Sequence, residues 1–233
     1  MSLELRPFAD LGHFKIDWLE ARHHFSFGGY HDPERMGHSV LRVWNDDIIR
    51  PGTGFDPHPH RDMEIVTYVR QGAITHEDNM GNRGRTEAGD VQVMSAGTGV
   101  VHSEYNREEE ATRIFQIWFR TDAAGHPPHW ETREFPRGDR AGALVPLASG
   151  QPGVEGALPI HQDATLYGAT LPAGMAVTHR FAAGRSGYLV PATGAVMADG
   201  QRVDARDGLA ITGEDTIELT AIDDSELLLA DLP

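Results

Sequence analysis

The stretch His58-Pro59-His60-Arg61-Asp62-Met63-Glu64 carries two histidines one residue apart, and His102-Ser103-Glu104 begins 42 residues after His60. Along a β-strand the side chains alternate between the two faces, so residues i and i+2 point the same way. Two neighbouring strands of this kind would bring three imidazoles and one carboxylate to a single point. That ligand set is typical of a transition-metal site, and the sequence therefore predicts one here.

Two prolines indicate where in a sheet this site lies. Pro57 and Pro59 flank His58. Proline has no N–H group and holds the residue before it in an extended conformation, so the strand cannot be paired on both sides at this point. We therefore expect both histidines of the first pair to lie at a barrel rim, directed to the same side and close to a mouth through which a substrate enters.

The residues around both motifs approximate the two-part signature of the cupin superfamily. Its first part is glycine, His-x-His, glutamate and glycine, and its second part is glycine, a tight turn, histidine and asparagine. The matching positions are Gly52, His58, His60, Glu64 and Gly72, then Gly89, residues 95–97, His102 and Asn106. The chain departs from the signature in two spacings, Glu64 to Gly72 and Gly97 to His102, and it has Ser95 where proline is usual.

Four stretches, read in order, resemble the pirin family, the group that includes quercetin 2,3-dioxygenases. They are residues 22–30 (Arg-His-His-Phe-Ser-Phe-Gly-Gly-Tyr), 41–47 (Leu-Arg-Val-Trp-Asn-Asp-Asp), 58–64 and 102–106. The resemblance is dense over residues 8–130 and continues more loosely to the C-terminus. It implies an all-β bicupin, with two double-stranded β-helix (jelly-roll) barrels and one metal site in the N-terminal barrel.

The same resemblance assigns the metal-ligand roles to His58, His60, His102 and Glu104. Glu104 would also act as the catalytic base. The resemblance favours Fe(II) as the one divalent metal of the chain, while the ligand types also suit Mn(II), Ni(II) or Cu(II). Zinc is a further option, although tetrahedral zinc with all four ligands in place would leave no open position. Glu64 is then expected to lie outside the ligand set and to accept a hydrogen bond from an imidazole N–H, which would orient that ring. The alternative is that Glu64 is an ordinary surface carboxylate.

The chemistry implied by the resemblance is the opening of the heterocyclic ring of a flavonol such as quercetin by O2, with release of carbon monoxide. The expected partners are therefore a small planar aromatic substrate and O2. Two alternatives stay open. The site of a pirin-type protein could serve as a non-enzymatic metal- and redox-sensing switch in regulation, or the chain could have another cupin activity such as an isomerase.

Composition narrows the remaining classes of function. The chain has no cysteine, which excludes disulfides, metal–thiolate sites and a cysteine nucleophile. Its net charge of -15 disfavours nucleic acid or an anionic membrane as a partner. No apolar run is long enough to span a bilayer and no signal-peptide pattern precedes the first strands, so a cytoplasmic protein is expected. A monomer is expected because each chain carries both barrels.

Short β-type runs separated by Gly, Asn and Asp dominate the chain and predict the strands of a sandwich or barrel. The runs are residues 40–44, 64–70, 73–77, 91–95, 113–119, 166–171, 187–190, 209–212, 216–222 and 226–230. Residues 113–119 are apolar on nearly both faces, which favours a strand buried inside a double-layered barrel. We predict an N-terminal barrel with the metal site at 1–134, a Gly- and Pro-rich connection at 135–158 and a C-terminal barrel without a metal site at 159–233.

The other histidines carry weaker signals. His23 and His24 are expected to form hydrogen bonds within the fold. His76 could lie on a hairpin beside the site, although an exposed strand position is the favoured interpretation. A faint echo of the first half in the second aligns His102 with Leu219 and Glu104 with Ala221, and it supplies no second His-x-His motif.

Overall fold

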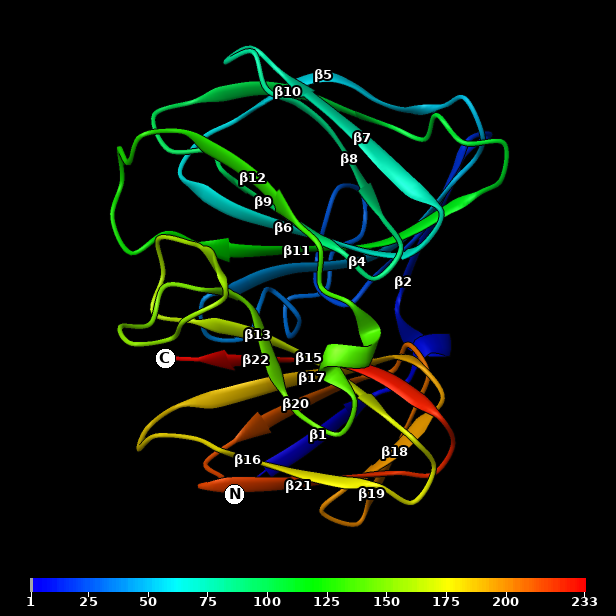
Figure 1. The fold of residues 1–233 in the computed structure, drawn as a ribbon, viewed down its shortest axis with the longest axis vertical. Coiled ribbons are helices and arrows are strands. Elements are labelled where there is room, and N and C mark those ends of the chain that lie inside the picture. The colour runs from blue at the N-terminus through cyan, green and yellow to red at the C-terminus, as the bar shows by residue number, and fades with distance from the viewer. Residues whose placement is uncertain (1) are drawn as a thin grey trace. The chain divides into compact units, whose positions relative to one another are not determined.

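The computed structural model describes residues 2–233 and is built almost entirely from antiparallel β-strands (Figure 1). Contacts between Cα atoms divide the chain into two units. The N-terminal unit comprises Gly12–Phe135 and Leu158–Gln162, and the C-terminal unit comprises the residues up to Leu11, Pro136–Ala157 and Asp163–Pro233. The prediction of an all-β bicupin is confirmed.

In the N-terminal unit a large sheet and a small sheet form the two walls of a barrel (Figure 1). The large sheet has the strand order β12-β9-β6-β11-β4-β3-β2, and the small sheet has the order β5-β10-β7-β8. The strands are β2 (Gly12–Lys15), β3 (Leu19–His23), β4 (Leu41–Ile49), β5 (Gly54–His60), β6 (Met63–Gln71), β7 (Ala73–Asp78), β8 (Arg83–Glu87), β9 (Val91–Ser95), β10 (Val100–Tyr105), β11 (Thr112–Arg120) and β12 (His129–Arg133). The short β14 (Leu158–Pro159) also falls within this unit but belongs to neither of its two sheets.

The C-terminal unit repeats this plan. Its large sheet pairs β1, β20, β17, β22, β15 and β13 in that order, and its small sheet has the order β16-β21-β18-β19. The elements are β1 (Ser2–Arg6), η1 (Phe8–Asp10), η2 (Arg137–Arg140), β13 (Val145–Ser149), β15 (Thr165–Leu171), β16 (Ala176–Arg180), β17 (Ser186–Thr193), β18 (Ala195–Ala198), β19 (Gln201–Asp204), β20 (Gly208–Thr212), β21 (Thr216–Ala221) and β22 (Ser225–Leu232), where η marks a 3₁₀ helix.

The strand pairing divides the chain differently from the three predicted segments at two places. β1 pairs with β20, so the first strand belongs to the C-terminal sheet and not to the barrel that follows it in sequence. The Gly- and Pro-rich connection contains β13, which pairs with β15. Both strands are only five residues long, and Pro146 interrupts β13, which weakens the strand signal there.

The small sheets of the two units correspond strand by strand, and this correspondence explains the faint sequence similarity between the two halves of the chain. His102 pairs with His58 across β10 and β5, whereas the corresponding pair of β21 and β16 is Leu219 with Val177. Leu219 and Val177 pack in the hydrophobic core of the C-terminal unit. Apolar packing thus fills the place that the histidines take in the N-terminal unit.

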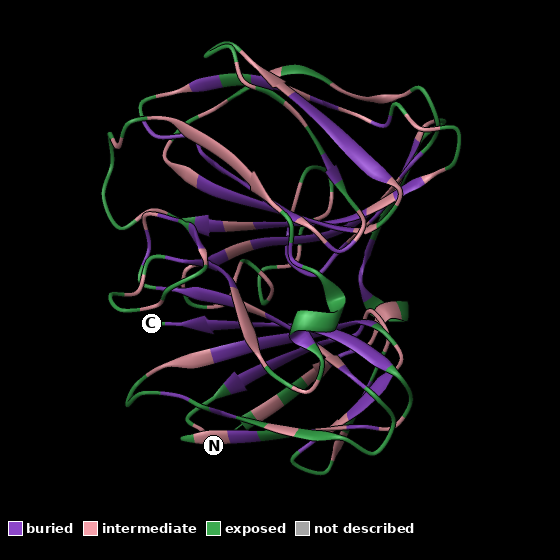
Figure 2. Ribbon diagram, in the orientation of Figure 1, coloured by how far each residue is buried: buried purple, intermediate pink, exposed green. Residues whose placement is uncertain are grey.

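Burial follows the strand order within each sheet (Figure 2). β11 lies between β6 and β4, and most of its residues are buried, as the two-faced apolar pattern of residues 113–119 predicts. β5 is the edge strand of its sheet and pairs only with β10. The predicted edge position of the proline-flanked histidines is therefore observed.

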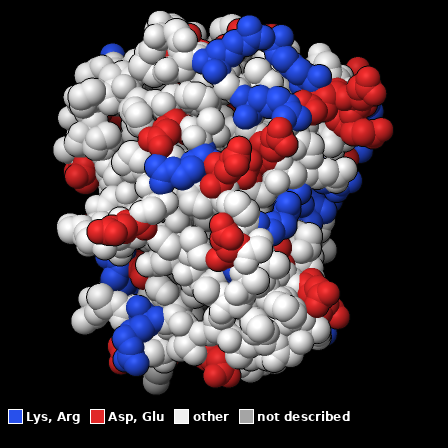
Figure 3. Space-filling model, viewed as in Figure 1, with Lys and Arg blue, Asp and Glu red and all other residues white. Residues whose placement is uncertain are grey.

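Acidic and basic side chains are interleaved on the face seen in Figure 3. Exposed ion pairs such as Arg85 with Glu108 bring opposite charges together at the surface. On the face in Figure 3 the acidic side chains are not gathered into a single patch. Among residues 2–233, no helix is long and apolar enough to cross a membrane.

Candidate metal centre

Three histidines converge where β5 and β10 pair. His58 lies directly opposite His102 in the register of the two strands, and His60 follows on the same face of β5. One ring nitrogen from each of His58, His60 and His102 lies within 4.8 Å of the other two. The ring centroids of the three pairs are 4.5–5.0 Å apart. In the described chain this is the only such group of three or more potential ligands, and Glu104 is not part of it.

Hydrogen bonds behind the rings fix the tautomers of two of these histidines. The Nδ1 atom of His58 lies 2.7 Å from the backbone carbonyl oxygen of Asp56. A carbonyl only accepts, so His58 Nδ1–H donates and its Nε2 atom carries a lone pair. That lone pair faces the Nε2 atom of His102 at 3.1 Å.

The partner of His102 is a second histidine. His102 Nδ1 lies 3.3 Å from His76 Nδ1, and His76 Nε2 lies 3.1 Å from Asp78 Oδ2. The Asp78 carboxylate only accepts, so His76 donates through Nε2–H and accepts at Nδ1 from His102 Nδ1–H. The Nε2 atom of His102 is therefore also unprotonated and directed at the cluster.

This donor set fits a divalent cation. Two unprotonated Nε2 atoms at 3.1 Å cannot hydrogen bond to each other, and a metal ion between them would satisfy both lone pairs. Burial lowers the pKa of His60 to about 4. Burial, together with the charges of the neighbouring histidines, lowers the pKa of His102 to about 2. Neutral imidazoles are the form that a metal requires.

The carboxylate of Glu104 is held by a polar row on the large sheet. It accepts hydrogen bonds from Gln92 Nε2 and Gln116 Nε2, each at 2.6 Å, and from Thr67 Oγ1 at 3.3 Å. Gln116 pairs with Thr67, and Thr67 pairs with Gln92, across β11, β6 and β9. The row therefore crosses the strands at a single level, as directly opposed residues on one sheet face do.

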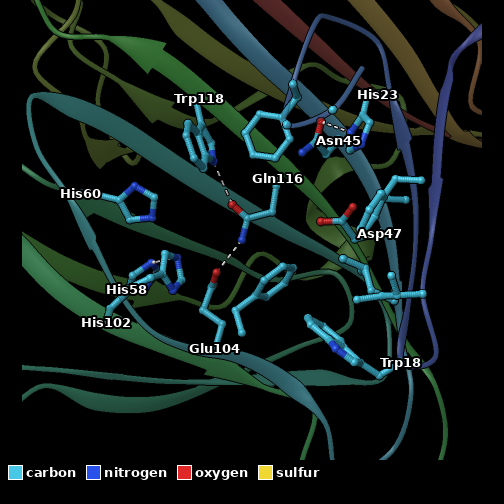
Figure 4. A pocket seen from close by; sticks show the side chains of 18 residues that line it. Trp18, His23, Asn45, Asp47, His58, His60, His102, Glu104, Gln116 and Trp118 are labelled. Carbon is cyan, nitrogen blue, oxygen red and sulfur yellow. Dashed lines mark hydrogen bonds between the residues drawn. The ribbon is translucent and has the colours of Figure 1, made fainter. Parts of the chain in front are cut away.

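Burial raises the pKa of Glu104 to about 7, although its three hydrogen bonds act in the opposite direction. Trp118 Nε1–H donates to Gln116 Oε1 at 3.0 Å, and the ring of Trp118 lies edge-on to His60 with centroids 5.0 Å apart. Figure 4 shows the chain of hydrogen bonds from Trp118 through Gln116 to Glu104, beside the three histidines. Whether Glu104 is a fourth ligand stays a prediction.

A pocket of about 450 Å³ opens beside the cluster, and the three histidines and Glu104 lie in its wall. Its volume is within the roughly 300–1,000 Å³ range of small-molecule sites. Large aromatic side chains form much of the remaining wall, and a few polar side chains interrupt it. The aromatic residues are Phe14, Trp18, Phe27, Phe55 and Trp118, and the polar ones are His23, Asn45, Asp47 and Gln116.

The remaining sequence predictions have mixed outcomes. His23 forms the expected internal hydrogen bond, with its Nδ1 atom 2.8 Å from Asn45 Oδ1. The expectation of an exposed His76 is wrong, because its ring is fully buried and stacks on Trp130 at a centroid distance of 4.8 Å. Neither interpretation of Glu64 matches its position. It is buried, accepts a hydrogen bond from Ser95 and lies 3.5 Å from His161, and within residues 2–233 no hydrogen bond joins it to His58, His60 or His102.

Comparison with known proteins places the chain in a family. A family model described as Pirin matches residues 5–119, and one described as Quercetinase C-terminal cupin domain matches residues 147–232. A Pirin-like protein of Caulobacter vibrioides is 56% identical over 229 residues, which are 98% of this chain and 99% of the relative. The chain belongs to the pirin family.

Two further pirin relatives bear on the site. The Quercetin 2,3-dioxygenase of Escherichia coli is 43% identical over 232 residues, 98% of each chain. The crystal structure of bacterial pirin YhhW from Escherichia coli in complex with nickel(II) matches with a TM-score of 0.94 at 41% identity, over 100% of this chain and 99% of that one. The cupin fold, the three-histidine site and a nickel-bound relative together support one divalent metal in this pirin.

Proposed function

We propose that this protein is a metal-dependent dioxygenase that opens the heterocyclic ring of flavonols such as quercetin with O2 and releases carbon monoxide. The observation that carries the proposal is the three-histidine cluster in the wall of a largely aromatic pocket that also contains a buried carboxyl group. Pirin relatives named for this activity support it. The metal we propose is iron, one per chain, held by His58, His60 and His102 with Glu104 as the fourth ligand.

The residues of the chain have separate roles in this reaction. A bound metal would supply a Lewis-acidic, redox-active centre that brings the 3-hydroxyl group and O2 together. Glu104 would accept the proton of the flavonol 3-hydroxyl group. Burial raises its pKa to about 7 in the protein without a bound metal, which favours proton uptake at this carboxyl group.

The aromatic wall would hold the substrate and exclude water. The rings of Phe27 and Trp118 meet edge-to-face at 5.4 Å, as those of Trp18 and Phe55 do at 5.2 Å. Such rigid apolar faces suit a planar ring system and lower the local dielectric around the reacting groups.

The test is quercetin turnover by iron-loaded protein with O2 uptake and carbon monoxide measured together. We expect one carbon monoxide released per O2 consumed, and no reaction without air. Loss of quercetin without O2 uptake would indicate another cupin reaction. A fully metallated protein that leaves quercetin unchanged would contradict the proposal and favour a non-enzymatic, metal-sensing role.

A further inference from the structure

The pocket contains a buried carboxyl group that the proposed reaction does not use. This residue is Asp47, on β4. Its predecessor Asp46 points to the opposite face of the sheet and forms a buried ion pair with Arg70. Asp47 shares its face with Asn45 and lines the pocket, as strand alternation requires. Of the two adjacent carboxyl groups, only Asp46 has a paired cation among the described residues.

Asp47 is 3% exposed, and its Oδ1 atom is buried with no hydrogen-bond partner among the described residues. Its cross-strand neighbours cannot supply one, since they are Ala21 on β3 and Ile114 on β11. Buried polar groups in native proteins are paired almost without exception, and an unpaired one calls for an explanation. Because Asp47 faces the pocket, a bound ligand would supply the missing hydrogen-bond partner.

The protonation state of Asp47 indicates which ligand group it suits. Burial raises its pKa well above the ordinary value, and the charges of Asp46 and Glu104 raise it further, while Arg70 opposes them. The Asp47 carboxyl group therefore holds a proton more readily than an ordinary aspartate, and its protonated form has one O–H donor and a carbonyl acceptor. A neutral acid can donate to and accept from a hydroxyl group, and it does not repel a substrate that has lost a proton elsewhere.

Figure 4 shows Asp47 on the side of the pocket away from His58, His60 and His102, with Gln116 and Glu104 between them. We propose that Asp47 is a specificity-determining residue that binds a phenolic hydroxyl group on a substrate ring remote from the metal. This inference rests on the proposed function. It narrows the substrate class from flavonols in general to those that carry a hydroxyl group beyond the one at carbon 3.

The test compares two ligands with the same ring system. Quercetin carries further ring hydroxyl groups, and 3-hydroxyflavone carries only the one at carbon 3. Dissociation constants are measured without O2, so that no turnover occurs, on metal-loaded wild type, Asp47→Val and Asp47→Asn. Asparagine keeps a donor and an acceptor, valine keeps neither, and Asp47→Ala replaces the valine variant if that one does not fold.

We expect wild type to prefer quercetin by about tenfold or more, because a site built for a hydroxyl group rejects the ligand that lacks it. Asp47→Val should lose this preference, and Asp47→Asn should keep most of it. An unchanged preference in Asp47→Val, or none in wild type, would overturn the inference and leave the dioxygenase proposal intact. If wild type bound neither ligand, the flavonol function itself would fail.

Discussion

The Nδ1 atom of His76 lies 3.3 Å from the Nδ1 atom of His102, so His76, which is outside the three-histidine cluster, hydrogen bonds to a histidine of that cluster. The hydrogen bond continues from His76 to Asp78, which also accepts from the backbone N–H groups of Met80 and Asn82. These bonds and one from the Asn82 side chain keep the pKa of Asp78 below its ordinary value, although burial raises it. The chain of bonds fixes the orientation and tautomer of His102 before a metal binds.

Breaking this chain should weaken metal binding without unfolding the protein. In Asp78→Asn the amide no longer provides a carboxylate acceptor for His76 Nε2–H. We expect about 10–100-fold lower metal affinity, the usual cost of losing a partner behind a ligand. Competition with a chelator of known affinity measures it. Glu77→Gln is the matched control, since Glu77 is on the same strand and pairs instead with exposed Arg107. Equal affinity in the two variants would refute the positioning role.

Gly84 lies across the strand pair from His76 and leaves space for the ring of Trp130, which stacks on His76. A Cβ atom on Gly84 would lie 2.3 Å from Cη2 of Trp130, the ring that stacks on His76. Gly84→Ala should therefore displace Trp130 and lower the free energy of unfolding by about 1–3 kcal/mol. Denaturant titration checks this. Gly138→Ala, where an added Cβ meets nothing within 4 Å, is the control, and an equally small effect in both would contradict the packing argument.

The amide of Gln116 should matter for turnover more than for folding. Gln116→Leu removes a 2.6 Å hydrogen bond to Glu104 and the acceptor for Trp118. A hydrogen bond to a charged group contributes about 1.5–3 kcal/mol, so we expect about a 10–100-fold loss in kcat/KM for quercetin. Gln71→Leu, at the exposed end of β6, should retain wild-type kinetics. A Gln116→Leu enzyme with unchanged kcat/KM would show that this amide does not position Glu104 for reaction.

Asp47 should leave a signature in the pH dependence of stability. Its pKa is raised in the folded state, so between its unfolded pKa near 4 and its folded pKa the native protein binds more protons than the unfolded chain. The free energy of unfolding therefore falls as pH rises through this window, by up to about 1.4 kcal/mol per pH unit. Asp47→Asn should remove that slope. Parallel stability curves for the two proteins would mean that Asp47 is ionised in the fold.

The sequence was sufficient to predict those features of the site that depend on local chain geometry. The i, i+2 spacing of His58 and His60 and the prolines beside them predict one face of an edge strand, and β5 has both properties. The two predicted ligand-bearing strands do pair with each other. The resemblance to pirins added the bicupin plan and the choice of metal.

The residues that hydrogen bond to the predicted ligands are set by which strands pair with each other. The spacing of residues along the chain does not contain that information. His76 reaches His102 only because β10 pairs with β7 as well as with β5. Thr67, Gln92 and Gln116 come together across three strands that are not consecutive in sequence. A local signal did exist, because each is a polar residue on an otherwise apolar strand face, and such residues are candidates for a buried network.

The most direct test of the central claim measures metal content and quercetin loss together, in air, on iron-loaded wild type and its His60→Ala variant. We predict about one metal per wild-type chain with turnover, and loss of most metal and all turnover in a variant that remains folded, because His60 is only half-buried and lies at the end of an edge strand. Turnover that persists in a metal-depleted His60→Ala protein would contradict the claim that the three-histidine cluster is the catalytic centre.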